Sequence, residues 1–239
     1  MRHLLIILLL LSCTVISLFA QVTATVDSLK NSPLGVMNRK AAEYAKQFGF
    51  EGEIKYDSDN TRFISLMGMY YNIDVTDTLS AVETASKLIQ DLIPYFGVNK
   101  DQLAAPVCNE AYMYFAVKFV QQINGIGFEA PANITFFFYN DENKVLVESG
   151  IYPNLNFPVT GYISREKAIN TYTTLKGKNN LSEMTADMMI CPLYKPDLSA
   201  ELEPRSFRVC WVIIVRNYKM YIDALTGKII GKGIQEPFD

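Results

Sequence analysis

Histidine is almost absent from this sequence. Its 239 residues include a single histidine, His3, which lies in an apolar N-terminal segment. Without an imidazole elsewhere, the chain lacks the base of Ser-His-Asp and Cys-His catalysis, the HExxH zinc site and any histidine-ligated metal. It also lacks a GxGxxG run and a P-loop, and Gly231-Lys232-Gly233 is too short to hold a phosphate. We therefore expect no enzymatic activity, no cofactor and no metal.

A surplus of charge is missing as well. The 22 Lys and Arg residues nearly balance the 25 Asp and Glu residues, which leaves a net charge of −3. A nucleic-acid partner requires a basic face, so we do not expect one. Hydrophobic residues make up 49% of the chain, a composition typical of a folded protein. Solvated turns, rather than a hydrolase's carboxylate pair, are expected at Asp57/Asp59, Asp141/Glu142 and Glu201/Glu203.

The longest apolar run is at the N-terminus. Arg2 precedes an apolar stretch from Leu4 to Ala20, and polar Gln21 follows it. This pattern predicts a secretory signal peptide over residues 1–20. Lipoprotein-type cleavage with a lipid anchor at Cys13, or an uncleaved anchor, are the alternatives. No later stretch is long and apolar enough to span a bilayer, so we expect a secreted or periplasmic protein, or one anchored by lipid at the cell envelope.

Three cysteines remain beyond the predicted signal, namely Cys108, Cys191 and Cys210. An odd number in a secreted chain leaves at least one free thiol or an intermolecular bond. Their spacing fits no zinc motif. Buried apolar thiols and a Cys191–Cys210 disulfide both remain compatible with the sequence.

The first half of the chain predicts helices and strands in alternation. Residues 21–60 predict a polar leader with one short helix from Pro33 to Phe48 and a charged loop over residues 51–60. A strand over residues 62–73 follows. The next helix is capped by Thr76 or Asp77 and closes at Pro94 and Gly97. Its apolar stripe, at spacings of three and four, consists of Leu79, Val82, Ala85, Leu88, Ile89 and Leu92.

The period then becomes alternating, which indicates strands. Residues 108–151 predict an antiparallel meander of three strands with turns at residues 123–127 and 141–144. The run Phe136–Tyr139 places aromatic rings on both strand faces. One explanation is burial by a helix on one side and a neighbouring domain on the other, and the alternative is an exposed patch for a partner.

The second half repeats this design. Ser164 begins a helix that Gly177 ends, and residues 176–206 predict a connecting loop with one edge strand near residues 188–194. Two or three strands follow from Phe207 to Ile230. The order of elements predicts an α+β fold of two units, each a helix packed on an antiparallel sheet.

The last segment, residues 221–230 (YIDALTGKII), carries the most specific motif. Asp223 ends a strand and can accept hydrogen bonds from turn amides, Thr226 can cap the same turn, and Gly227 supplies a positive φ. Together with the preceding strand around Trp211, this hairpin resembles that of a PepSY domain. We expect these three residues to build a turn and to carry no chemistry.

The middle of the chain resembles the propeptide domain of thermolysin- and fungalysin-type metallopeptidases. The motifs that carry this resemblance are residues 94–98 (PYFGV), 120–126 (VQQINGI), 147–155 (VESGIYPNL) and 163–169 (ISREKAI). The resemblance implies a propeptide-like domain over residues 61–157 and a PepSY-like domain over residues 158–239, both cystatin-like. No peptidase domain with a zinc-binding helix follows here, so the expected role is not that of the peptidase.

The resemblance implies a non-catalytic partner of peptidases. The leading hypothesis is a free-standing inhibitor or folding helper of a secreted peptidase, which covers the substrate cleft with a hairpin or sheet edge. The alternative is a binding or scaffold module of the cell envelope that uses the fold without a peptidase. The partner contacts that we predict from the hairpin tips are Asn124, Gly125, Phe128, Asp141 and Asn143.

Overall fold

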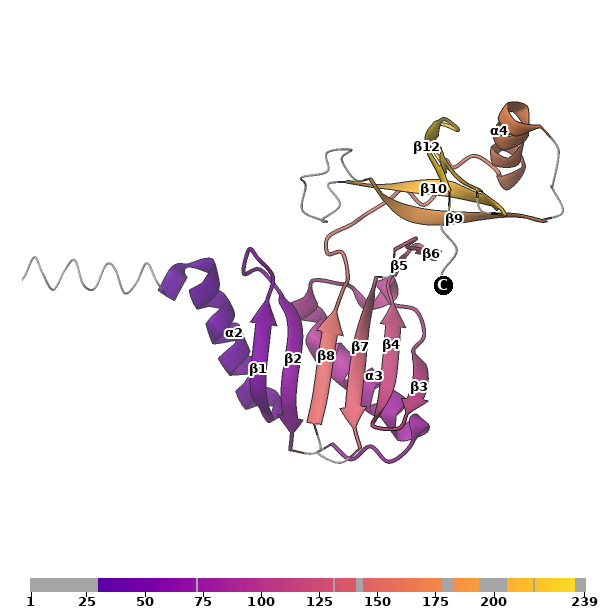
Figure 1. Ribbon diagram of the computed structural model, residues 1–239. Coiled ribbons are helices and arrows are strands. Elements are labelled where there is room, and N and C mark those ends of the chain that lie inside the picture. The colour runs from indigo at the N-terminus through magenta and orange to yellow at the C-terminus, as the bar shows by residue number, and fades with distance from the viewer. Residues whose placement is uncertain are drawn as a thin grey trace, which may run out of the picture.

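The computed structural model describes residues 30–71, 73–130, 132–140, 144–177, 183–193, 206–216 and 218–234. Its largest element is a six-stranded antiparallel sheet in the order β1-β2-β8-β7-β4-β3 (Figure 1). The strands of this sheet are β1 (Phe50–Tyr56), β2 (Phe63–Tyr70), β3 (Val107–Ala111), β4 (Tyr114–Val120), β7 (Asn133–Tyr139) and β8 (Lys144–Ser149).

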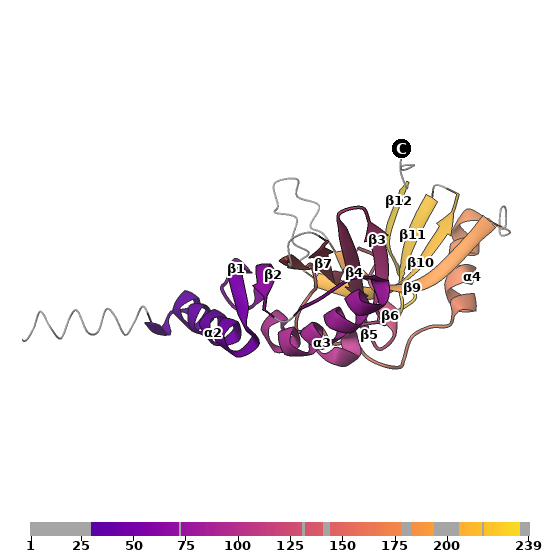
Figure 2. The same ribbon diagram turned by 90° about the horizontal axis from the view of Figure 1, so that it is seen from below.

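Helices α2 (Pro33–Phe48) and α3 (Thr78–Phe96) lie on the same side of this sheet (Figure 2). The Asp77 carboxylate accepts a hydrogen bond from the Ser80 amide and caps α3, and Gly97, at a φ of +71°, ends it. Both predicted ends of α3 are therefore confirmed, although Pro94 lies inside the helix. The predicted stripe is wrong at Leu79, which is 67% exposed, because Ala81 faces the core in this first turn.

The predicted loop over residues 51–60 is wrong, because residues 50–56 form edge strand β1 and pair with β2 along its length. The strand was not predicted because its outward residues, Glu51, Glu53 and Lys55, are charged and therefore typical of a loop. Tyr44 of α2 and Phe50 of β1 are buried in the same core as β2, with ring centroids 6.2 Å apart. The helix and strand of the predicted leader therefore pack with the first sheet.

The second unit places α4 (Arg165–Lys176) on a four-stranded antiparallel sheet in the order β12-β11-β10-β9. Its strands are β9 (Met184–Leu193), β10 (Ser206–Val215), β11 (Tyr218–Asp223) and β12 (Ile229–Ile234). Ser164 caps the helix as predicted, and Tyr172 is buried against the sheet. Most of the predicted edge strand exists, but β9 begins at Met184, so residues 184–187 are not loop. The α+β prediction of helix-on-sheet units is confirmed.

A small hairpin joins the two units. It consists of β5 (Gln122–Ile123) and β6 (Ile126–Gly127), it follows β4 in the chain, and β5 contacts the short 3-10 helix Lys100–Gln102. Beyond β6, Phe128 forms a parallel bridge with Ile190 of β9, and the Glu129 amide donates to the Ile190 carbonyl at 3.0 Å. We call this junction the seam. Its buried apolar core comprises Ile123, Ile126, Ile190, Val209 and Ala224.

Among the described residues, no helix is long and apolar enough to cross a membrane.

Candidate functional site

The hairpin predicted to contact a partner lies at the seam. Asn124 and Gly125 form its turn, with φ values of +54° and +78°, and both are exposed. The Asn124 side-chain amide donates to the Phe157 carbonyl at 3.0 Å. Phe128 is half-buried, with its ring centroid 5.4 Å from that of Tyr152 and 5.9 Å from that of Phe207. This hairpin therefore contacts the chain's own second unit, which leaves Phe128 engaged within the molecule.

The other two predicted contacts, Asp141 and Asn143, lie outside the described residues. Their neighbour Asn140 is described, and it links the end of β7 to the turn between β3 and β4. The Asn140 amide donates to the Met113 carbonyl at 3.1 Å, and its side-chain amide donates to the Tyr112 carbonyl, also at 3.1 Å.

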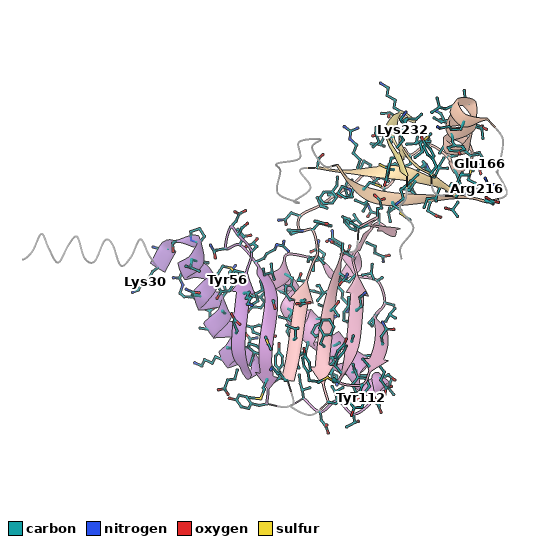
Figure 3. All side chains as sticks on the ribbon, viewed as in Figure 1. Lys30, Tyr56, Tyr112, Glu166, Arg216 and Lys232 are labelled. Carbon is teal, nitrogen blue, oxygen red and sulfur yellow. The ribbon has the colours of Figure 1, made fainter. Side chains whose placement is uncertain are left out.

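The turn that Asn140 holds is the most exposed apolar site among the described residues. Ala111 pairs with Tyr114, so Tyr112 and Met113 alone form the turn, which we call the tip. Tyr112 is 98% exposed and Met113 is 63% exposed. Figure 3 shows Tyr112 at the end of the first sheet. Tyr71, at the same end of the sheet, is 71% exposed. Turns normally use Gly, Asn, Asp, Pro or Ser for their backbone geometry, so the tip has no local reason to contain Tyr and Met.

The tip was not predicted from the sequence. We interpreted the alternation from Tyr112 to Phe119 as a continuous strand because no turn-forming residue interrupts it. The available signal was length, since one strand from residue 108 to the predicted turn at residues 123–127 would exceed the usual limit of about ten residues.

The first sheet also has an open face, on the side away from α2 and α3. Its outward residues lie in three rows across the strands, in register. The middle row contains Glu53, Met67, Leu146, Phe137, Ala116 and Asn109. The row nearer the tip contains Glu51, Met69, Lys144, Tyr139, Tyr114 and Ala111. The row nearer the seam contains Lys55, Ser65, Glu148, Thr135, Lys118 and Val107.

The open face decides between the two explanations for the aromatic run. Phe136 and Phe138 are buried under the helices, whereas Phe137 lies on the open face and contacts Tyr114 at a centroid distance of 5.4 Å. Met67 and Met69, in the same face, are 40% and 44% exposed. A helix covers one side as expected, and no described helix or strand packs on the other. This arrangement favours the second explanation, an exposed patch on one side of the strand.

The predicted PepSY-type turn lies beside the seam in the second unit. Asp223 Oδ1 accepts hydrogen bonds from the Leu225 amide at 3.1 Å and from the Thr226 amide and hydroxyl at 2.8 and 2.9 Å. Asp223 Oδ2 accepts from Arg208 at 2.9 Å, and Gly227 has a φ of +72°. Burial alone would raise the pKa of Asp223, but the hydrogen bonds from Thr226 and Arg208 outweigh it and hold that pKa below its usual value.

A second cluster of ionisable groups lies on the face of the second sheet that points away from α4. Glu129, from the seam, pairs with Lys219 at 2.8 Å and accepts a hydrogen bond from the Tyr221 hydroxyl at 2.5 Å. Cys191 and Cys210 lie in the same apolar cluster on neighbouring strands, a diagonal apart in register. Both are buried free thiols in the structure, one of the two states that the sequence allows.

The Cys191 thiol and the Tyr221 phenol of this cluster are held in their protonated forms. The hydrogen bond with the Cys210 thiol and burial raise the pKa of Cys191, and burial and Glu129 raise the pKa of Tyr221. A thiol with a raised pKa is a poor nucleophile near neutral pH. No group of three metal-ligating side chains occurs in the part of the chain that is described.

Comparisons with known proteins give little. No family model matches the chain, and no curated protein matches it. Among solved structures, it is similar to the Bacillus megaterium YpeB C-terminal domain, with a TM-score of 0.38 and 13% identical residues over 84% of this chain and 97% of that one.

Proposed function

We propose that the protein is an exported, non-catalytic binding protein that inhibits a secreted peptidase or assists its folding. In this proposal the tip enters the peptidase's substrate cleft and blocks it sterically. The observation that supports the proposal is the exposure of Tyr112 and Met113 in a tight, hydrogen-bonded turn. Asp141, which the sequence predicts as a partner contact, follows directly in the chain on Asn140, whose hydrogen bonds hold the tip.

The tip has the physical properties of a binding anchor. Tyrosine is enriched among residues that contribute most to protein interfaces, because it buries a large area with few rotatable bonds. The paired strands β3 and β4 and the bonds from Asn140 hold the tip's backbone before any partner arrives. This preorganisation lowers the conformational entropy that binding would remove.

The test is inhibition of metallopeptidases secreted by the same organism, measured with the purified exported protein. We expect inhibition at micromolar concentration or below, and at least a tenfold weaker effect from the double variant Tyr112→Ser/Met113→Ser. The matched control is Val159→Ser, which removes a 74% exposed apolar side chain from the linker between the units and should inhibit like the parent. Full inhibition by the double variant would remove the tip from the proposal, and no effect on any co-secreted peptidase would end it.

The open face favours the alternative, a scaffold module of the cell envelope. A scaffold needs a broad surface for a lasting contact, and the apolar middle row supplies one. This alternative gains support if the protein is recovered from the envelope fraction in a complex that the tip variant leaves intact.

A further inference from the structure

On two strands of the open face, charges of opposite sign lie at equal distances on either side of the middle row. The remaining charge of the two outer rows, Lys118 on β4, has Tyr114 as its counterpart. On β8, Lys144 and Glu148 lie two positions on either side of Leu146. On β1, Glu51 and Lys55 lie two positions on either side of Glu53. In both strands the residue near the tip and the residue near the seam have opposite charges. Between its polar ends, Glu53 and Asn109, the middle row is apolar and consists of Met67, Leu146, Phe137 and Ala116.

We infer that the open face binds a second copy of this chain, through a two-fold axis that runs along the middle row. Rotation about this axis exchanges the row near the tip with the row near the seam. Lys144 of each copy therefore faces Glu148 of the other, and Glu51 faces Lys55. Leu146 and Phe137 pack on their own counterparts at the axis. A contact of this self-complementary kind is what a closed two-fold dimer requires.

The match is best at the centre of the face. Packed sheets cross at about 30°, which keeps residues near the axis opposite one another and displaces those at the edges. The Lys144–Glu148 pairs, on a central strand, therefore contribute more than the Glu51–Lys55 pairs. Glu53 meets its own counterpart at the edge, where it is exposed and lies 3.9 Å from Lys55, which limits the repulsion.

The size of the face sets the expected affinity. Six strands at about 4.8 Å spacing, with about five residues of each in contact, give roughly 500 Å² per copy and about 1,000 Å² in total. This area is at the lower limit of specific interfaces, so we expect a dimer with a dissociation constant in the micromolar range.

A second copy explains the pattern better than another occupant does. An unrelated partner, or the apolar N-terminal segment of this chain, requires an apolar surface but has no need for charges of opposite sign at equal distances from one row. The inference goes beyond the proposed function, since the dimer leaves both tips at opposite ends of the assembly and free to bind.

The experiment is sedimentation equilibrium of the purified protein from 1 to 200 µM at low and at high salt. We expect a monomer–dimer equilibrium that high salt weakens. Leu146→Lys should raise the dissociation constant of the dimer at least tenfold, whereas Val159→Lys, the matched control away from the face, should leave it unchanged. Circular dichroism verifies that each variant is folded. A monomer at 200 µM, or a dimer that Leu146→Lys leaves intact, overturns the inference.

Charge exchange separates this geometry from other dimers. Lys144→Glu and Glu148→Lys should each weaken self-association, because each places like charges opposite one another. Mixing these two variants should restore a heterodimer, and the double variant K144E/E148K should restore the homodimer. Failure of both restorations excludes the proposed axis. The tip variants should dimerise normally, so the result is independent of whether the protein inhibits a peptidase.

Discussion

The β5–β6 turn and the β3–β4 turn contrast in sequence and in surroundings. The β5–β6 turn uses Asn124 and Gly125, which are suited to its positive φ values, and its hairpin contacts the second unit. The β3–β4 turn uses Tyr112 and Met113, which have no such conformational role, and their side chains extend into solvent. One hairpin has residues that favour its own backbone conformation, and the other has exposed residues to which the proposed function assigns a partner.

This difference shows what turn-forming residues indicate. An Asn-Gly pair indicates that the backbone adopts a left-handed conformation, and it does not indicate a partner contact. We predicted a partner contact at this hairpin because its turn was evident in the sequence. In the structure, the turn that is evident in the sequence and the most exposed apolar side chains among the described residues lie in different hairpins and different sheets.

The largest effect on this comparison should come from Phe128→Ala in the seam. The substitution removes ring contacts with Tyr152 and Phe207 and leaves a cavity between the units. Since Phe128 is half-buried, we expect a loss of about 2 kcal/mol in the free energy of unfolding, less than for a fully buried ring. Urea denaturation followed by circular dichroism measures it. An unchanged midpoint would show that the seam contributes little to stability.

The second effect concerns the other side of the seam, at Asp223. Replacing its carboxylate with an amide in Asp223→Asn weakens charge-assisted hydrogen bonds from Arg208 and Thr226, and we expect a loss of about 1.5 kcal/mol at pH 7. The folded-state pKa of Asp223 lies below its ordinary value of 3.8. The carboxylate's contribution is therefore complete above that ordinary value and is lost as the pH falls through the folded-state pKa.

Urea unfolding of both proteins at several pH values measures this contribution. The stability difference between parent and Asp223→Asn should be constant from pH 7 to about pH 5 and should shrink below about pH 4. A difference that grows as the pH falls would contradict the assigned sign.

The sequence predicted those elements whose period and ends agree. Helix α3 has an apolar stripe, an Asp77 cap and a Gly97 end, and β7 and β8 are rich in β-branched and aromatic residues. It failed for β1, whose alternating charged residues are typical of a loop until a neighbouring strand pairs with them. The predicted strand at β9 was too short for a related reason, since the polar residues Thr185 and Asp187 lie near its start.

The candidate surfaces could be predicted less well than the fold. The hydrogen bonds that Asp223 accepts from Leu225 and Thr226 are local and could be predicted, whereas the bond from Arg208 comes from the neighbouring strand β10. The seam depends on the pairing of Phe128 with Ile190, and the open face depends on a strand order in which β8 lies between β2 and β7. Contacts between residues so distant in the chain leave no periodic signal in one sequence.

The third effect sharpens the contrast between the two turns themselves. Gly125 has a φ of +78°, and a Cβ there would meet no atom within 4 Å, so Gly125→Ala tests backbone conformation alone. We expect a loss of about 1 kcal/mol in unfolding free energy. Met113→Ala, in the other turn, is the control and should leave the midpoint within error. Equal losses in the two variants would mean that the turns do not differ in conformational demand.

The smallest effect on stability should come from the tip. In the double variant Tyr112→Ser/Met113→Ser, one side chain that is 98% exposed and one that is 63% exposed are removed, so little buried area is lost. We expect the unfolding free energy to change by less than about 0.5 kcal/mol, as for most surface substitutions. The same urea titration measures it, beside Phe128→Ala as the destabilised reference. A loss comparable to that of Phe128→Ala would mean that the tip packs within the molecule. An unchanged stability combined with lost inhibition would mean that Tyr112 and Met113 are present for a partner, since the fold does not need them.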